Sequence, residues 1–294
     1  MSWPDTGTVA GDRVLAEAAE AFQTVLGERF LAAYALGSLA HGGFSELVSD
    51  VDLGLLIHDP LDAGDGDTIR AVAESEKRKG SPLHERLSVF WGTPATLRGE
   101  REGGRFPPLD RLDLIENGRL LSGDDARHGL PAPSRRELLV AGAEFALGYL
   151  AGVHGPVDSS GQATGTVRPA GRDATEEIRN SDVLLSQDIR RVTKIVLFPV
   201  RFLYTAATGQ VGTNHCAVAR YLEDNLAPST RLTAAALRWR INPPSDQSAA
   251  AKLLREELLP LYLHYIDEHI VRLDSLDEIG LAAAFRNWRD RLAS

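Results

Sequence analysis

Two short polar motifs, each beside an apolar run, constrain the fold of this chain more than any other feature. Gly37-Ser38 follows the apolar residues 34–36, and Asp50-Val51-Asp52 precedes the apolar residues 53–57. Because residues i and i+2 of a β-strand project to the same face, Asp50 and Asp52 are expected to lie side by side at a strand start. The spacing therefore predicts two neighbouring strands, with polar groups gathered where the first strand ends and the second begins.

The chemistry of these four polar residues indicates a metal ion and a phosphate. Two adjacent carboxylates, Asp50 and Asp52, repel each other unless a cation lies between them, and oxygen-only ligands favour Mg²⁺ or Mn²⁺ over zinc. Gly37 and Ser38 are expected to offer backbone N–H groups, and the next helix its positive N-terminal end, to a phosphate. The alternative is a surface turn with two solvated acids. A buried strand start rarely carries two adjacent acids without a partner, which favours a metal ion between them. A metal ion beside a phosphate implies nucleotide chemistry.

The pattern resembles the nucleotidyltransferase superfamily related to DNA polymerase beta. In that superfamily an apolar strand, Gly-Ser, a short helix and Asp-x-Asp on the next strand follow one another. The matching residues here are Gly37, Ser38, Asp50 and Asp52, and Ser49 fits the common Ser-Asp-x-Asp form. The resemblance implies that Asp50 and Asp52 are catalytic and hold Mg²⁺ (or Mn²⁺), and that Gly37 and Ser38 orient the leaving phosphates of ATP. Residues 112–123 also resemble the closing strand of such a domain, where the expected role is structural.

The position of a third carboxylate is the main departure from the superfamily pattern. The superfamily usually places one on the strand after Asp-x-Asp, here predicted over 85–91, as a metal ligand or general base. Ser88 occupies that place, and serine is not ionised near neutral pH. Glu85 is the expected base if a β-bulge turns it to the other strand face, and Glu144 is a second candidate that can equally be a partly exposed helix residue. A nucleotide-binding regulatory or interaction protein with a degenerate site therefore remains open.

The second half of the chain has a different composition from the first. Pro131 and Pro133 mark a linker, after which helical periodicity dominates. We therefore expect an α/β (α+β) nucleotidyltransferase domain with a small mixed sheet over 1–130, and an all-helical C-terminal domain over 131–294. Strands are predicted over 30–36 and 51–57, and Pro199 is expected to end or kink its helix. The helices predicted for the second domain are 135–153, 174–208, 213–225, 230–240, 247–273 and 275–292.

Residues 200–211 are similar to part of the helical domain of the aminoglycoside adenylyltransferases. In that family an apolar helix with an arginine runs into a Thr-Gly turn. The resemblance implies that the helical domain closes the nucleotide and acceptor cleft, with Arg201 directed toward the nucleotide phosphates. A later lysine of the family falls at Asn214 here, and Lys194 is the residue expected to replace it by position. The alternative for Arg201 and Lys194 is a side chain that lies along apolar surface or pairs with an acid such as Asp188.

The charge and the composition of the chain indicate which kinds of partner it can bind and where in the cell it is expected. The net charge is −9, which argues against a broad nucleic-acid surface and favours a cationic acceptor through electrostatic steering. No run of about 18 apolar residues is present, so no membrane span is expected. The N-terminal residues lack the pattern of a secretory signal. The single cysteine, Cys216, excludes an intramolecular disulfide, and a cytoplasmic location is expected.

The function predicted from these observations is transfer of AMP from ATP to a hydroxyl of a small polar acceptor such as an aminoglycoside. Two alternatives stay open: the degenerate nucleotide-binding protein named above, and an enzyme that modifies a protein hydroxyl. A polymerase acting on nucleic acid is disfavoured by the acidic charge balance. The acceptor, the preferred base of the nucleotide and the oligomeric state are not predicted from the sequence.

Overall fold

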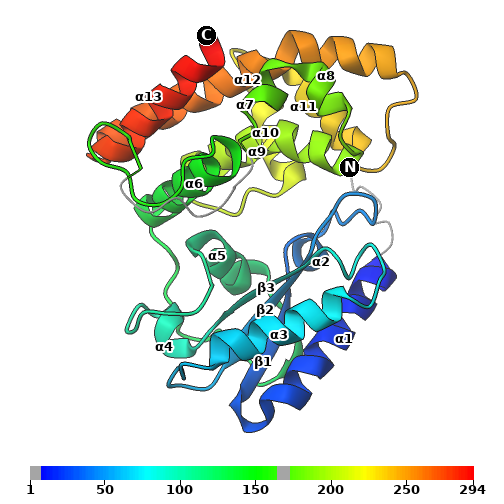
Figure 1. Ribbon diagram of the computed structural model, residues 1–294, viewed down its shortest axis with the longest axis vertical. Coiled ribbons are helices and arrows are strands. Elements are labelled where there is room, and N and C mark those ends of the chain that lie inside the picture. The colour runs from blue at the N-terminus through cyan, green and yellow to red at the C-terminus, as the bar shows by residue number, and fades with distance from the viewer. Residues whose placement is uncertain (1–7, 164–172) are drawn as a thin grey trace. The chain divides into compact units, whose positions relative to one another are not determined.

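The computed structural model describes residues 8–163 and 173–294. The chain divides into two compact units, Met1–Pro133 and Ser134–Ser294. The first unit contains a four-stranded mixed sheet with helices, and the described part of the second unit is mainly helical (Figure 1). This confirms the α+β fold class with a helical C-terminal part that the sequence predicted.

The sheet of the first unit has the strand order β3-β2-β1-β4. Strand β1 (Phe30–Leu36) pairs antiparallel with β2 (Val51–Ile57) and with β4 (Arg119–Gly123), whereas β2 runs parallel to β3 (Leu87–Gly92). Strands β1 and β2 have the bounds that the sequence predicted. Because β1 ends where β2 and β3 begin, the residues just after β1 lie at the same edge of the sheet as the residues that start β2.

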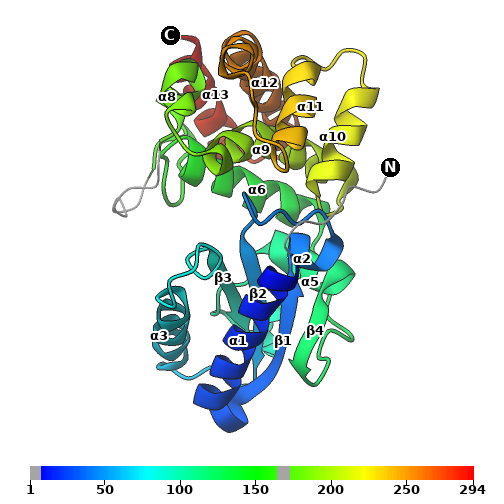
Figure 2. The same cartoon turned by 90° about the vertical axis from the view of Figure 1, so that its right-hand side faces the viewer.

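Helices cover both faces of this sheet (Figures 1 and 2). Along β1, Ala33 and Ala35 belong to the core that includes the buried residues of α1 and α3, whereas Tyr34 and Leu36 belong to the core beneath α4 and α5. Cover on both faces explains why the central strands read as nearly continuous apolar runs. The helices of this unit are α1 (Thr8–Leu26), α2 (Ser38–His41), α3 (Asp65–Lys77), α4 (Pro94–Leu97) and α5 (Pro108–Asn117), with a 3₁₀ turn at Gly27–Arg29.

The segment 174–208 of the second unit forms three helices instead of the single helix that we predicted. Asn180 accepts a hydrogen bond from the backbone N–H of Asp182, and Asp188 accepts one from the backbone N–H of Arg191. Side chains of this kind start new helices, because they satisfy N–H groups that have no partner inside the helix. The helices are α6 (Arg135–Leu150), α7 (Thr175–Arg179), α8 (Ser181–Leu185), α9 (Ile189–Thr208), α10 (Asn214–Glu223), α11 (Thr230–Trp239), α12 (Gln247–Ser275) and α13 (Ile279–Ala293).

Helix α9 does not end at Pro199, which lies inside it. Proline has no backbone N–H, so the carbonyl of Ile195, one turn earlier, loses its helical hydrogen bond. The hydroxyl of Tyr262 on α12 donates to the Ile195 carbonyl oxygen at 2.8 Å. A side chain from another helix thus satisfies the carbonyl that the proline leaves open, and α9 continues to Thr208.

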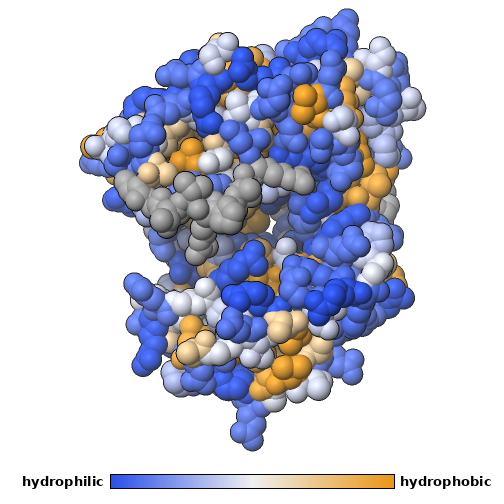
Figure 3. Space-filling view, in the orientation of Figure 1, coloured by the Kyte–Doolittle hydropathy of each residue, from blue (hydrophilic) through white to orange (hydrophobic). Residues whose placement is uncertain are grey.

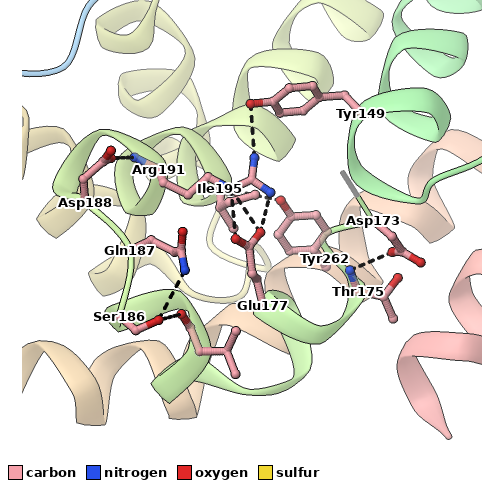
Figure 4. Close-up of polar contacts among 11 residues, drawn as sticks. Tyr149, Asp173, Thr175, Glu177, Ser186, Gln187, Asp188, Arg191, Ile195 and Tyr262 are labelled. Atoms are coloured by element: carbon pink, nitrogen blue, oxygen red, sulfur yellow. Dashed lines mark hydrogen bonds and ion pairs between the residues drawn. The ribbon is translucent and has the colours of Figure 1, made fainter. Parts of the chain in front are cut away.

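A buried arginine joins three helices of the second unit (Figure 4). The guanidinium Nε of Arg191 on α9 donates to both carboxylate oxygens of Glu177 on α7, at 3.1 and 3.0 Å. Its Nη1 donates to the hydroxyl of Tyr149 on α6 at 3.1 Å. The Arg191 side chain is 5% exposed and that of Glu177 is 14% exposed. Each charge therefore depends on the other, because neither has much contact with water.

The buried side chain of His269 leads us to expect that stability falls in mild acid. Its ring stacks on Phe285 and its Nδ1–H donates to the carbonyl of Tyr265, and burial lowers the pKa of His269 to about 3. An unfolded histidine titrates near pH 6.5, so the unfolded state takes up a proton first as the pH falls. This side chain alone should lower the free energy of unfolding by about 2.5 kcal/mol between pH 7 and pH 4.5.

Urea unfolding of the protein and of His269→Phe at both pH values checks this expectation. The phenylalanine keeps an aromatic ring against Phe285 but cannot bind a proton, so the variant should lack this part of the loss. A loss of the same size in both proteins would show that His269 does not titrate on unfolding.

None of the helices in residues 8–163 and 173–294 is both long and apolar enough to cross a membrane. On the face that Figure 3 shows, polar side chains predominate and apolar ones form small separate patches.

Candidate active site

The Gly37-Ser38 step forms a sharp turn between β1 and α2. Gly37 has φ 59° and ψ −147°, a backbone conformation that residues with a Cβ rarely adopt. Helix α2 begins immediately at Ser38, and the backbone N–H groups of Ala40 and His41 both donate to the Gly37 carbonyl. The strand therefore gives way to a helix at Gly37, at the edge of the sheet where β1 ends.

Asp52 lies directly against this turn. It pairs with Leu36 across the antiparallel ladder of β1 and β2, and a Cβ built on Gly37 would overlap its Oδ2 atom. Asp52 is half-buried, whereas its neighbours Val51 and Leu53 are fully buried. The structure thus brings the second acid of the Asp-x-Asp motif into contact with the Gly-Ser turn, and only glycine leaves room for that contact.

Asp50 immediately precedes β2 and is also half-buried. The backbone N–H of Val51 donates to the carbonyl of Arg86 at 3.2 Å, so β2 and the chain before β3 are already paired at this point. Asp50 therefore lies at the same sheet edge as Asp52 and the Gly37 turn. That the two carboxylates share one face remains a prediction from the strand pattern.

The structure differs from our prediction at the third strand. Strand β3 begins at Leu87, so Glu85 is an exposed residue of the preceding turn and does not lie on the strand. The register from Leu87 to Gly92 is regular, so no β-bulge in β3 turns Glu85 toward the other face. Ser88 pairs with Asp52, as expected for the residue that takes the place of the third acid. Glu85 stays at the same sheet edge as Asp50, because the parallel strands β2 and β3 both start there.

A buried acid that we did not predict, Asp113, contacts the Gly37 turn. Its Oδ2 atom accepts the backbone N–H of Gly37 at 2.6 Å, and its Oδ1 atom accepts Nδ2 of Asn117 at 2.9 Å. Asp113 is 6% exposed and lies on α5. The only signal in the sequence is an acid between two apolar residues, Leu112 and Leu114, in a segment to which we assigned a structural role.

The contact with Asp113 changes which groups are left to bind a phosphate. The N–H of Gly37, which we expected to face a phosphate, is donated to the Asp113 carboxylate. The N–H groups of Ser38 and Leu39 are at the first positions of α2, where no intrahelical acceptor exists. These two N–H groups are therefore the better candidates for phosphate contacts.

Asp113 also leads to a prediction about stability. Asp113→Ala removes the acceptor of the Gly37 N–H, and we expect the free energy of unfolding to fall by about 1–3 kcal/mol, as for a buried donor left without a partner. Asp113→Asn is the matched control, because its amide oxygen still accepts that N–H and the Asn117 amide can turn to accept from it. Urea unfolding of the two variants checks the prediction, and equal stabilities would contradict it.

The two predicted basic residues belong to the second unit. Lys194 and Arg201 lie on α9, seven residues apart, which is about two helical turns and places them on the same side. Nε of Arg201 donates to the carbonyl of Gly212 at 2.7 Å, so part of the guanidinium holds the turn that follows α9. An approach of either residue to Asp50 and Asp52 remains a prediction.

Glu144, the second candidate base, is exposed on α6. Loss of hydration near the helix surface, together with the carboxylate of Glu278, raises the pKa of Glu144. A carboxylate with a raised pKa is a stronger proton acceptor near neutral pH than an ordinary one. Its position relative to the sheet edge of the first unit likewise remains a prediction.

The donor set at the sheet edge fits Mg²⁺ bound together with a nucleotide. Within the described parts of the chain, no group of three His, Cys, Asp or Glu side chains is arranged to hold a metal ion by itself. Mg²⁺ commonly takes one or two carboxylates and completes its coordination with phosphate oxygens and water. Asp50 and Asp52 supply that number of carboxylates, so the residues present fit the ion only with a phosphate ligand beside them.

Similarity to known proteins is found among solved structures and not at the level of sequence. No protein-family model matches the sequence, and no curated protein matches it. The structure is similar to that of spectinomycin adenyltransferase AAD(9) from Enterococcus faecialis, determined with ATP and spectinomycin, with a TM-score of 0.48 and 11% identity over 99% of this chain and 100% of that chain.

Proposed function

We propose that this protein is a Mg²⁺-dependent nucleotidyltransferase that moves AMP from ATP to a hydroxyl of a small polar acceptor such as an aminoglycoside. The observation that supports the proposal most strongly is the contact of the Asp52 carboxylate with Gly37. The contact brings a carboxylate that can bind Mg²⁺ next to the start of α2, where the N–H groups of Ser38 and Leu39 have no acceptor within the helix. Triphosphate chemistry uses this combination of a metal ligand and N–H donors. A cytoplasmic location, in keeping with the single cysteine, is part of the proposal.

Each candidate residue has a distinct role in this proposal. Asp50 and Asp52 hold Mg²⁺, and the ion, when bound, neutralises charge on the triphosphate. The N–H groups of Ser38 and Leu39 orient the leaving phosphates next to the Gly37 turn. Lys194 and Arg201, from a helical unit that closes over the nucleotide, compensate the remaining phosphate charge and exclude water.

Two carboxylates are candidates for the base that takes the proton from the acceptor hydroxyl. Glu85 is supported by its place at the same sheet edge as Asp50, whereas Glu144 is supported by its raised pKa. The acidic net charge of −9 favours a cationic acceptor in either case, because it raises the local concentration of cations.

The direct test is an assay of pyrophosphate release and label transfer from α-labelled ATP. We expect release that requires both Mg²⁺ and an acceptor, with spectinomycin and a set of aminoglycosides tried first, and we expect the label on the acceptor. Mg²⁺-dependent ATP binding without pyrophosphate release over that set would overturn the proposal in favour of a nucleotide-binding regulatory protein. Transfer of label to protein bands in a cell lysate would instead indicate an enzyme that modifies protein hydroxyls.

A further inference from the structure

The second unit contains a cavity that the proposed function does not use. It has a volume of about 420 Å³ and lies between helices α9, α10 and α12. Sites for small molecules typically have volumes of roughly 300–1,000 Å³. All of its lining residues belong to Ser134–Ser294, so the cavity is complete within one unit.

Aromatic and apolar side chains form one part of the cavity wall. Tyr204 and Tyr221 line it from α9 and α10, and His264 lines it from α12. The Tyr221 hydroxyl donates to the carbonyl of Pro228 at 2.9 Å, and the Tyr204 hydroxyl donates to Oε1 of Gln210 at 3.0 Å. Because both hydroxyls already have partners, the rings are the parts of these side chains that remain for a ligand.

The charged part of the wall carries an excess of negative charge. Arg272 and Glu268 form an ion pair at 2.7 Å and compensate each other. Glu223 and Asp224 lie at the C-terminal end of α10, and in residues 8–163 and 173–294 neither carboxylate forms an ion pair. Among the residues that line the cavity, Arg220 in the last turn of α10 is the one other cationic side chain that can oppose these two acids.

The helix end adds to this negative charge. The last carbonyl groups of a helix lack intrahelical partners and act as a partial negative charge. Burial raises the pKa of Tyr221, and the Asp224 carboxylate raises it further, so this carboxylate acts on the tyrosine that lines the cavity. The cavity therefore combines an aromatic wall with a rim that attracts cations.

We propose that this cavity binds a small organic ammonium ion. The ammonium group faces Glu223 and Asp224, and the apolar body of the ligand lies against the rings of Tyr204 and Tyr221. An ammonium close to an aromatic face gains a further attraction from the ring. The site does not depend on nucleotide chemistry, so it stands even if the proposed transferase activity fails.

Two probes with the same ring and chain but opposite charge test the proposal. Phenethylammonium and 3-phenylpropionate are titrated into the full chain at low ionic strength, with binding followed by calorimetry and by ligand-observed NMR. We expect a dissociation constant in the millimolar range for phenethylammonium, and binding of 3-phenylpropionate weaker by a factor of about ten, because exposed charges interact strongly only at low salt. Equal binding of the two probes, or binding of neither, would overturn the proposal.

Variants locate the binding in the cavity. Glu223→Gln with Asp224→Asn should weaken phenethylammonium binding about fivefold, as expected for exposed ion pairs, and Arg220→Gln should strengthen it. Asp67→Asn with Glu74→Gln makes the same change of charge on α3 of the other unit and should leave binding unchanged. Equal weakening by the two double variants would show a general charge effect and overturn the assignment of the site.

Discussion

Replacing Asp50 and Asp52 together by asparagine is expected to lower nucleotidyl transfer by a factor of about a thousand or more. An asparagine amide has nearly the volume of the carboxylate but no negative charge, so it would not hold the Mg²⁺ ion that we propose for this site. A thousandfold loss corresponds to about 4 kcal/mol of transition-state stabilisation, which is within the range for a catalytic metal ion. The comparison of kcat/KM for pyrophosphate release in the two proteins measures the effect.

The fold should survive this double substitution. Asp50 and Asp52 are half-buried at a strand start, and asparagine keeps nearly the same volume and still accepts hydrogen bonds through its amide oxygen. The urea midpoint should therefore change little. Asp62→Asn, which changes an exposed acid outside the site, is the activity control. Undiminished turnover by the double variant would contradict the proposed role of Asp50 and Asp52 in binding Mg²⁺.

Arg191→Met is expected to lower the free energy of unfolding by about 3–5 kcal/mol, as measured by urea denaturation at pH 7. The substitution leaves the Glu177 carboxylate nearly buried without the guanidinium that contacts both of its oxygens. It also removes the donor to the Tyr149 hydroxyl. The loss thus combines an uncompensated charge with the separation of α6, α7 and α9 at their common contact.

A second substitution distinguishes the effect of the buried charge on stability from the effect of packing. Arg191→Met combined with Glu177→Gln leaves no buried charge, and it should recover most of the stability that Arg191→Met loses, because a buried ion pair replaced by neutral groups is often nearly neutral in energy. If the double variant is as unstable as Arg191→Met alone, packing and not charge holds the three helices together.

Local patterns predicted the strands that carry the candidate site. The bounds of β1 and β2 agree with the prediction, because Gly37 and Asp50 interrupt the two apolar runs at the points where the strands stop and start. The contact of Asp52 with Gly37 follows from the same pattern, since a short connection places the end of one strand beside the start of the next.

Local sequence patterns did not predict the contacts between segments that are distant in the sequence. Asp113 reaches the backbone of Gly37 across 76 residues of sequence, because α5 packs beneath β1, and nothing near Asp113 in the sequence indicates that packing. Similarly, α9 continues past Pro199 because Tyr262, from another helix, donates to the Ile195 carbonyl. Glu85 lies outside β3 because the regular ladder begins only at Leu87.

A crystal structure with a non-hydrolysable ATP analogue and Mg²⁺ tests the proposed site most directly. We predict a Mg²⁺ ion bound by carboxylate oxygens of both Asp50 and Asp52, with the triphosphate contacting the N–H groups of Ser38 and Leu39. A triphosphate bound away from this turn, or the two aspartates facing apart with no ion between them, would contradict the account.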